Sequence, residues 1–121
     1  IRENEVRSEP FMLDGARIGI VAFGTSARVC KTAIQWARKA GIAVGMLRPV
    51  TLFPFPEDAV RNLSESVDAL LVVEMNTGQM VEDVRQSTPH HEKIHFFGKP
   101  CAIPTPEEIF ERIRALAERK R

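Results

Sequence analysis

The sequence is poor in cysteine, carries no excess of charge of one sign and has no long apolar run. Two cysteines, Cys30 and Cys101, cannot form a disulfide framework, so we expect a reducing location, by default the cytoplasm. The 17 basic and 16 acidic residues are spread along the chain, which argues against a nucleic-acid partner. No apolar run reaches the roughly 18 residues that a membrane span needs, so no membrane partner is expected.

Hydrophobic residues make up 44% of the 121 residues, which is enough for the core of one domain. Residues 1–9 are mostly charged and are predicted to form a linker or arm, and residues 10–121 to form the domain. Because the first residue is Ile1, we expect the chain to be a fragment of a longer polypeptide.

Short apolar runs alternate with segments of helical spacing. Strands are predicted at residues 11–13, 18–23, 43–47, 68–74 and 94–97, and helices at 27–40, 56–63, from 77 or 78 to about 86, and 106–119. This alternation predicts parallel βαβ units, while Asp14-Gly15 predicts a hairpin between the first two strands. The expected fold is a three-layer α/β/α domain with a mostly parallel five-stranded sheet, an antiparallel edge strand and residues 18–23 at its centre.

Residues at the predicted helix ends support these boundaries. Ser26 is a predicted N-cap of the first helix, and Gly41 is expected to close it. Thr105 is expected to cap the last helix, where Pro106 suits the first helical position.

Glycine-rich phosphate loops are missing. Neither G-x-G-x-x-G nor G-x-x-x-x-G-K-[ST] occurs. Two predicted helix starts could still bind an anion through free amides and the helix dipole, although every helix has such amides and most are merely capped. The candidate anion-binding residues are Gly24, Thr25, Ser26, Arg28, Thr77 and Gly78.

Polar residues follow the apolar strand at 68–74. Glu74 ends that strand, and one interpretation is that it could pair with Arg48 at the end of a neighbouring strand. Alternatively, Glu74, Asn76 and Gln79 only satisfy backbone amides around the turn, as most buried polar groups do. Both interpretations stay open.

Two proline-rich segments, 48–56 and 98–104, are too apolar for ordinary exposed loops. Prolines hold Phe53 and Phe55 in an extended segment, where they could form a surface that packs on another domain. The alternative is that they cover this domain's own core.

The histidines cluster late in the chain, at His90, His91 and His95. A surface loop is favoured over a metal site, because closed metal sites usually recruit cysteine or carboxylate at tighter spacing. Ser26 lacks the nucleophile-elbow context of a hydrolase. We therefore assign no catalytic residue and no metal ligand.

Four segments together resemble a known family. They are residues 22–28, 45–56, 73–80 and 103–109, of which the second and third are distinctive: Arg-Pro-x-Thr-Leu-x-Pro-Phe-Pro and Glu-Met-Asn-x-Gly-Gln-Met. The chain resembles, over about residues 18–117, the C-terminal transketolase-like domain of the alpha subunit of 2-oxoacid:ferredoxin oxidoreductases.

This resemblance implies a role in an enzyme that oxidatively decarboxylates a 2-oxoacid to an acyl-coenzyme A. Thiamine diphosphate, Mg²⁺ and iron–sulfur clusters are then expected elsewhere in the complex, with none in this domain, and the isolated chain is expected to be inactive. The implied partners are the N-terminal domain of the same subunit, the thiamine-binding beta subunit and, through the complex, ferredoxin. The expected contact residues are Arg48, Phe53, Phe55, Glu74, Asn76 and Gln79.

Two alternatives remain at this stage. One is a stand-alone α/β module that binds a nucleotide or the phosphate of coenzyme A at the two helix starts. The other is a purely structural interaction domain.

Overall fold

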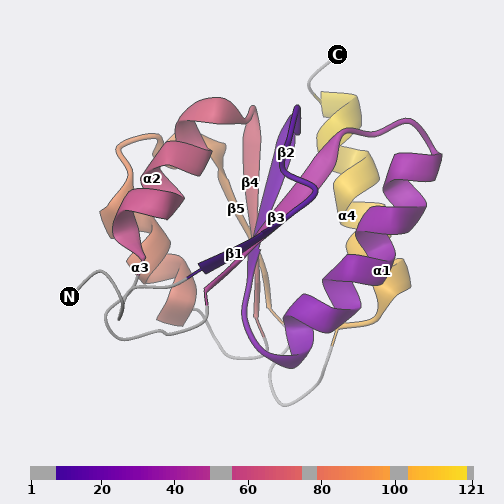
Figure 1. Ribbon diagram of the computed structural model, residues 1–121, viewed down its shortest axis with the longest axis horizontal. Helices are drawn as coiled ribbons and strands as arrows, with labels where there is room; N and C mark the ends of the chain where they lie inside the picture. Colours follow the sequence, from indigo (N-terminus) through magenta and orange to yellow (C-terminus); the bar gives the residue numbers. More distant parts are fainter. Residues whose placement is uncertain (1–7, 50–55, 75–78, 99–103, 120–121) are drawn as a thin grey trace.

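The computed structural model describes residues 8–49, 56–74, 79–98 and 104–119. The elements follow one another as β1 (Ser8–Phe11), β2 (Ile18–Ala22), α1 (Thr25–Lys39), β3 (Val44–Pro49), α2 (Glu57–Ser66), β4 (Ala69–Glu74), α3 (Gln79–Ser87), a 3₁₀ turn (His91–Lys93), β5 (Ile94–Gly98) and α4 (Pro106–Arg119). Helices α1 and α4 cover one face of the sheet, and α2 and α3 cover the other (Figure 1). The predicted three-layer α/β/α fold is confirmed.

The five strands form one sheet in the order β1-β3-β2-β4-β5. The pairs β2–β3, β2–β4 and β4–β5 are parallel, and β1 runs antiparallel to β3. The predicted central position of the strand at 18–22 is thus confirmed. Because crossovers between parallel strands are right-handed and β3 and β4 lie on opposite sides of β2, the connecting helices α1 and α2 cover opposite faces.

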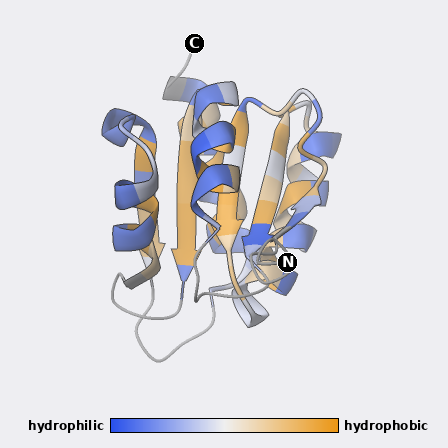
Figure 2. Ribbon diagram, turned by 60° about the vertical axis from the view of Figure 1, so that its left-hand side comes forward, coloured by the Kyte–Doolittle hydropathy of each residue, from blue (hydrophilic) through white to orange (hydrophobic). Residues whose placement is uncertain are grey.

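Side chains alternate between two hydrophobic cores, one on each face. In β2, Ile20 belongs to the core beneath α1 and α4, whereas Val21 belongs to the core beneath α2 and α3. In β4, Leu71 and Leu70 divide in the same way. The central strands β2 and β4 are therefore largely hydrophobic along their length, while the outer helix surfaces are largely hydrophilic (Figure 2).

The predicted hairpin is wrong. β1 begins at Ser8, inside the segment predicted as a linker, and pairs with β3 instead of β2. Asp14-Gly15 does form a turn, in which the Ala16 amide donates to the Leu13 carbonyl over 3.0 Å. However, β3 and β4 occupy both edges of β2, so β1 cannot pair with β2 and pairs with the outer edge of β3.

Helix ends follow the predicted signals with one exception. Gly41 closes α1 with φ of +88°, as expected. Thr105 and Glu108 form a reciprocal capping box at the start of α4, with bonds of 3.0 and 3.2 Å. The predicted Ser26 cap is wrong, because Gly24 is the N-cap residue of α1 and no side chain caps this end.

Gly45 allows the segment after β1 to cross over β3. A Cβ atom at this position would lie 2.7 Å from the Met12 carbonyl carbon and 2.8 Å from the Leu13 Cα. The Arg38 side chain holds the crossing segment by donating to the carbonyl oxygens of Met12 and Val44. Residue 45 therefore has to be glycine for this crossing.

We predict that Gly45→Ala lowers the free energy of unfolding by about 1–3 kcal/mol, because the added methyl group meets backbone atoms that cannot rotate away. Urea unfolding followed by circular dichroism measures this loss. Gly19→Ala is the matched comparison, since its Cβ would lie 3.1 Å from the movable Leu63 side chain, and its loss should be smaller. Equal losses for the two variants would contradict the close-crossing explanation.

Candidate functional site

The candidate site lies at the carboxyl ends of β2 and β4. These strands are adjacent, with Ala22 in register with Val73, and the strand order reverses between them. In open α/β sheets, such a reversal leaves a crevice outside the strand ends where ligands and partners bind. The heads of the parallel strands lie at the lower side of Figure 2.

Glu74 is a buried carboxylate at the carboxyl end of β4, with 8% of its surface exposed. Its Oε1 accepts the Met80 amide over 3.2 Å, and its Oε2 accepts the Val81 amide over 3.3 Å. The side chain therefore occupies the positive N-terminal end of α3. For Glu74, the interpretation that it satisfies backbone amides around the turn is confirmed.

Arg48 does not pair with Glu74, so that prediction is wrong. Arg48 lies on β3, opposite Glu9 of β1, and its Nη1 is 2.7 Å from the Glu9 Oε1. β2 separates β3 from β4, which places the two strands roughly 10 Å apart. The alternation of side chains also directs Arg48 toward the α1 and α4 face and Glu74 toward the α3 face.

The predicted anion-binding turn before α1 follows the carboxyl end of β2, at the same end of the sheet as Glu74. Gly24 has φ of +68°, and its carbonyl accepts the Ala27 amide over 3.0 Å. The first turn of α1 contains no acidic residue, and no side chain caps it. Thr25 and Arg28 are exposed, whereas Ser26 is 1% exposed.

Phe23 was not among the residues predicted for the site. It follows the last residue of β2 and is 39% exposed, although it belongs to the apolar run that the sequence assigns to a buried strand. The glycine that follows it, Gly24, is the sequence signal that could have indicated an exposed Phe23, because the strand ends one residue earlier than predicted. Phenylalanine is among the residues enriched in the cores of protein interfaces, so Phe23 is a candidate contact residue at this end of the sheet.

Several predicted site residues lie outside the described residues. They are Phe53, Phe55, Asn76, Thr77 and Gly78. Gln79 is the first residue of α3, but its side chain is likewise outside the described part.

Nucleophilic and metal-ligating side chains are scattered in the described residues. Cys30 is buried in the core beneath α1 and α4, and this burial raises the pKa of its thiol from 9.0 to about 12, so it stays protonated near neutral pH. His91 Nε2 lies 2.8 Å from the Arg85 carbonyl, and His90 Nδ1 lies 4.0 Å from a Glu92 carboxylate oxygen. Within the described ranges, no three His, Cys, Asp or Glu side chains gather as a metal site.

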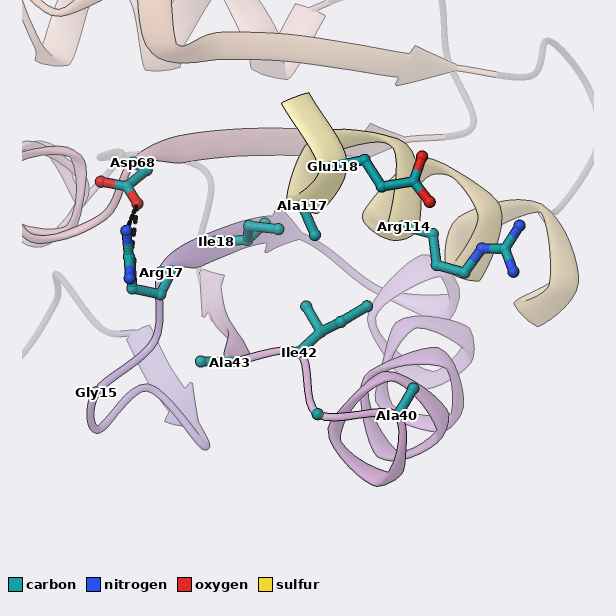
Figure 3. A pocket seen from close by; sticks show the side chains of 11 residues that line it. Gly15, Arg17, Ile18, Ala40, Ile42, Ala43, Asp68, Arg114, Ala117 and Glu118 are labelled. Atoms are coloured by element: carbon teal, nitrogen blue, oxygen red, sulfur yellow. Dashed lines mark hydrogen bonds and ion pairs between the residues drawn. The ribbon is translucent and has the colours of Figure 1, made fainter. Parts of the chain in front are cut away.

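An open hollow of about 640 Å³ lies at the opposite end of the strands from Glu74, by the amino ends of β2 and β4 (Figure 3). Ile18, Ile42 and Ala117 line it, and Arg17 and Asp68 stand at its rim. Arg17 Nη2 is 2.7 Å from Asp68 Oδ2, so these two charges satisfy each other. The lining residues come from distant parts of the chain, so the sequence gives no signal for this hollow.

No helix among the described residues is long and apolar enough to cross a membrane.

Comparison with known proteins identifies the family. Residues 16–109 match the family described as pyruvate:ferredoxin oxidoreductase core domain II. The chain belongs to this core domain II family. The resemblance drawn from the sequence motifs is thereby confirmed at the level of the family.

Curated relatives of core domain II include oxidoreductase subunits from archaea. The ketoisovalerate oxidoreductase subunit VorB of Methanothermobacter thermautotrophicus is 50% identical over 73% of this chain and 25% of its own length. The 2-oxoglutarate synthase subunit KorA of Archaeoglobus fulgidus is 38% identical over 75% of this chain and 26% of its own length. The chain thus spans about a quarter of the length of these relatives.

Solved structures share the core domain II fold. A 2-oxoglutarate:ferredoxin oxidoreductase from Magnetococcus marinus, solved with 2-oxoglutarate, coenzyme A and succinyl-CoA bound, matches 90% of this chain and 19% of its own chain with a TM-score of 0.80 and 26% identity. A split-gene transketolase in an inactive beta4 tetramer matches 95% of this chain and 42% of its own, with a TM-score of 0.76 and 15% identity. The second likeness concerns the fold alone and confirms a transketolase-like architecture.

We predict that Glu74→Gln destabilises the chain by about 1–3 kcal/mol, because the amide keeps one acceptor but turns an NH₂ group toward the α3 amides. Urea unfolding should show a lower midpoint with an unchanged slope. Glu82→Gln is the control, since Glu82 is an exposed carboxylate in the first turn of the same helix, and it should change stability by less than about 0.5 kcal/mol. Identical midpoints for Glu74→Gln and wild type would exclude a structural role for the Glu74 charge.

Proposed function

We propose that this chain is a packing and assembly domain of the alpha subunit of a cytoplasmic 2-oxoacid:ferredoxin oxidoreductase. Membership of core domain II and the likeness to VorB and KorA support the enzyme class. In this proposal the complete enzyme converts a 2-oxoacid to an acyl-coenzyme A. Thiamine diphosphate, Mg²⁺ and iron–sulfur clusters are held elsewhere in the complex.

The observation that carries the non-catalytic role is the bonding of Glu74. Among the described residues, Glu74 is the buried carboxylate at the strand-order reversal, and both of its oxygens accept amides of α3. A carboxylate held in this way stabilises its own domain, and it is poorly placed for acid or base catalysis. Cys30 likewise does not suit an iron–sulfur cluster, because it is buried inside the core.

The end of the sheet formed by the carboxyl ends of the parallel strands is the surface proposed to meet the rest of the subunit. Phe23 offers exposed apolar area there, and Arg48 is 37% exposed even with its Glu9 partner. Phenylalanine and arginine are both enriched at protein interfaces relative to the rest of the surface. We propose that Phe53, Phe55, Asn76 and Gln79 extend the same surface toward the N-terminal domain and the thiamine-binding beta subunit, with ferredoxin as a further partner of the complex.

The proposed function is tested by isolating the full-length parent polypeptide with its partners and assaying coenzyme A-dependent oxidation of 2-oxoacids with a viologen acceptor. We expect activity that depends on a thiamine-containing partner subunit, and the accepted 2-oxoacid then identifies the substrate. Recovery of a 121-residue polypeptide with no partner and no activity would overturn the proposal.

Two substitutions that introduce a charge into the full-length subunit test the proposed contact surface. Phe23→Asp and Phe53→Asp should each lower recovery of the assembled complex by about tenfold or more, because a buried interfacial aromatic is replaced by a charge. Met12→Asp is the control, since Met12 is 46% exposed but follows β1 at the opposite end of that strand from Ser8. If Phe53→Asp unfolds the 121-residue chain by circular dichroism, Phe53 belongs to the core and the interface role fails.

A second candidate function is phosphate binding at the start of α1, as in a stand-alone nucleotide or coenzyme A module. The observation that favours α1 is its uncapped first turn next to exposed Arg28. At α3, by contrast, the Glu74 carboxylate already accepts two of the amides that an anion bound near Thr77 and Gly78 would use.

This candidate predicts chemical-shift changes at Gly24 to Arg28 when coenzyme A is titrated at millimolar concentration into the labelled chain. The amides of Met80 and Val81 should not respond, because Glu74 retains them. Arg28→Ala should weaken the response. Unchanged shifts at residues 24–28 would remove the phosphate-binding function.

A further inference from the structure

The solvent-facing side of α1 carries a stripe of positive charge. Helix α1 contains four basic residues and no acidic residue, and the longer stretch of residues 15–56 contains no acidic residue either. Arg28, Lys31 and Lys39 are exposed, as is Gln35 between them. Positions three, seven and eleven residues apart lie on one side of a helix, so these four side chains form a stripe about 16 Å long.

The three cations of this stripe have no charged partner in the domain. Within the described residues, no carboxylate is ion-paired with any of them. The Lys31 ammonium stands 5.3 Å from the centre of the Phe11 ring, a contact that adds no negative charge. On the neighbouring helix α4, the Glu111 carboxylate bonds to Arg114 instead. The positive charges of α1 are therefore available to a partner.

The opposite layer of the domain has the opposite charge. Helices α2 and α3, on the other face of the sheet, carry five acidic residues and two arginines (Figure 1). One of these arginines, Arg61, is paired with Asp58. The net charge of +1 is thus the balance of a basic face and an acidic face. An acidic partner is attracted to α1 and repelled by α2 and α3, which fixes the side on which it binds.

An exposed tryptophan borders the stripe on the side toward α4. Trp36 is 36% exposed, and its ring meets the Phe110 ring edge to face, with the ring centres 6.2 Å apart. This contact holds the indole in one orientation at the surface. Tryptophan and arginine are among the residues that contribute most to binding at protein interfaces, so the composition of this surface suits a protein ligand.

We propose that the α1 stripe, formed by Arg28, Lys31, Gln35 and Lys39, binds an acidic peptide segment of a partner protein. An extended segment of about five residues covers the 16 Å stripe, so several carboxylates can face the three cations at once. A single anion at residues 24–28 would meet only one end of the stripe, which distinguishes this surface from the phosphate site considered above. Nucleic acid is disfavoured, because the net charge is only +1 and the acidic face would repel phosphates.

Fluorescence anisotropy tests this proposal with a labelled oligoglutamate peptide as the probe and the 121-residue chain as the receptor. Gln35→Glu places a negative charge in the middle of the stripe and should weaken binding about threefold to fivefold. Gln35→Lys should strengthen binding by a similar factor, because it adds a fourth cation. Binding to the wild-type chain should weaken as KCl rises from about 50 to about 300 mM, since salt screens exposed charges.

Gln86→Glu and Gln86→Lys are the matched controls. Gln86 is an exposed glutamine of α3, on the opposite face of the sheet, so the same substitutions change the net charge equally. Both variants should bind the peptide with the wild-type affinity. In the labelled wild-type chain, the peptide should shift amide resonances along α1 from Arg28 to Lys39.

Three results would overturn the proposal: no binding of the peptide at low salt, equal effects of the Gln35 and Gln86 variants, or shift changes confined to residues 24–28. Tighter binding of a single-stranded oligonucleotide of the same charge would overturn it in favour of a nucleic acid. Self-association of the chain that Gln35→Glu abolishes, measured by sedimentation equilibrium, would assign the stripe to a second copy instead.

Discussion

Burial of the sheet on both faces is the constraint on which this structure depends. Because β2 and β4 are covered by helices on either side, successive side chains along each strand must enter two different cores. Right-handed crossovers can satisfy this only if the chain moves outward from β2 in one direction and then returns past it in the other. The reversal of the strand order between β2 and β4 follows from this requirement.

At the carboxyl ends of the strands, Glu74 and Arg48 bond to other groups of the same domain. Glu74 stabilises the start of α3, and Arg48 joins β3 to the edge strand through Glu9. What remains exposed beside them is an aromatic ring, Phe23, and an uncapped helix start. In the proposed function, these exposed groups pack against another part of the parent subunit.

The fold was largely predictable from periodicity and helix-end signals. Apolar runs and the Thr105 and Gly41 signals located the elements, because these patterns act over a few neighbouring residues. The partner of the first strand was not predictable in this way. Asp14-Gly15 carries a local preference for a hairpin, but the pairing depends on which strand edges remain free once the sheet is assembled. The candidate site shows the same division, since the carboxyl end of β4 and the local bonding of Glu74 were among the sequence interpretations, whereas the partner of Arg48 depended on the strand order and on the face to which each side chain points.

By itself, the sequence determined the α/β class, the central strand, most helix boundaries and the family, because these depend on local spacing and on contiguous motifs such as Glu-Met-Asn-x-Gly-Gln-Met. Only the tertiary structure decided that Arg48 pairs with Glu9, that Phe23 is exposed, and that Arg112 donates a hydrogen bond to the Phe96 carbonyl. Each of these contacts joins elements far apart in the chain, or depends on where a strand ends in space. Their geometry is fixed by the packing of whole layers, to which no short stretch of sequence refers.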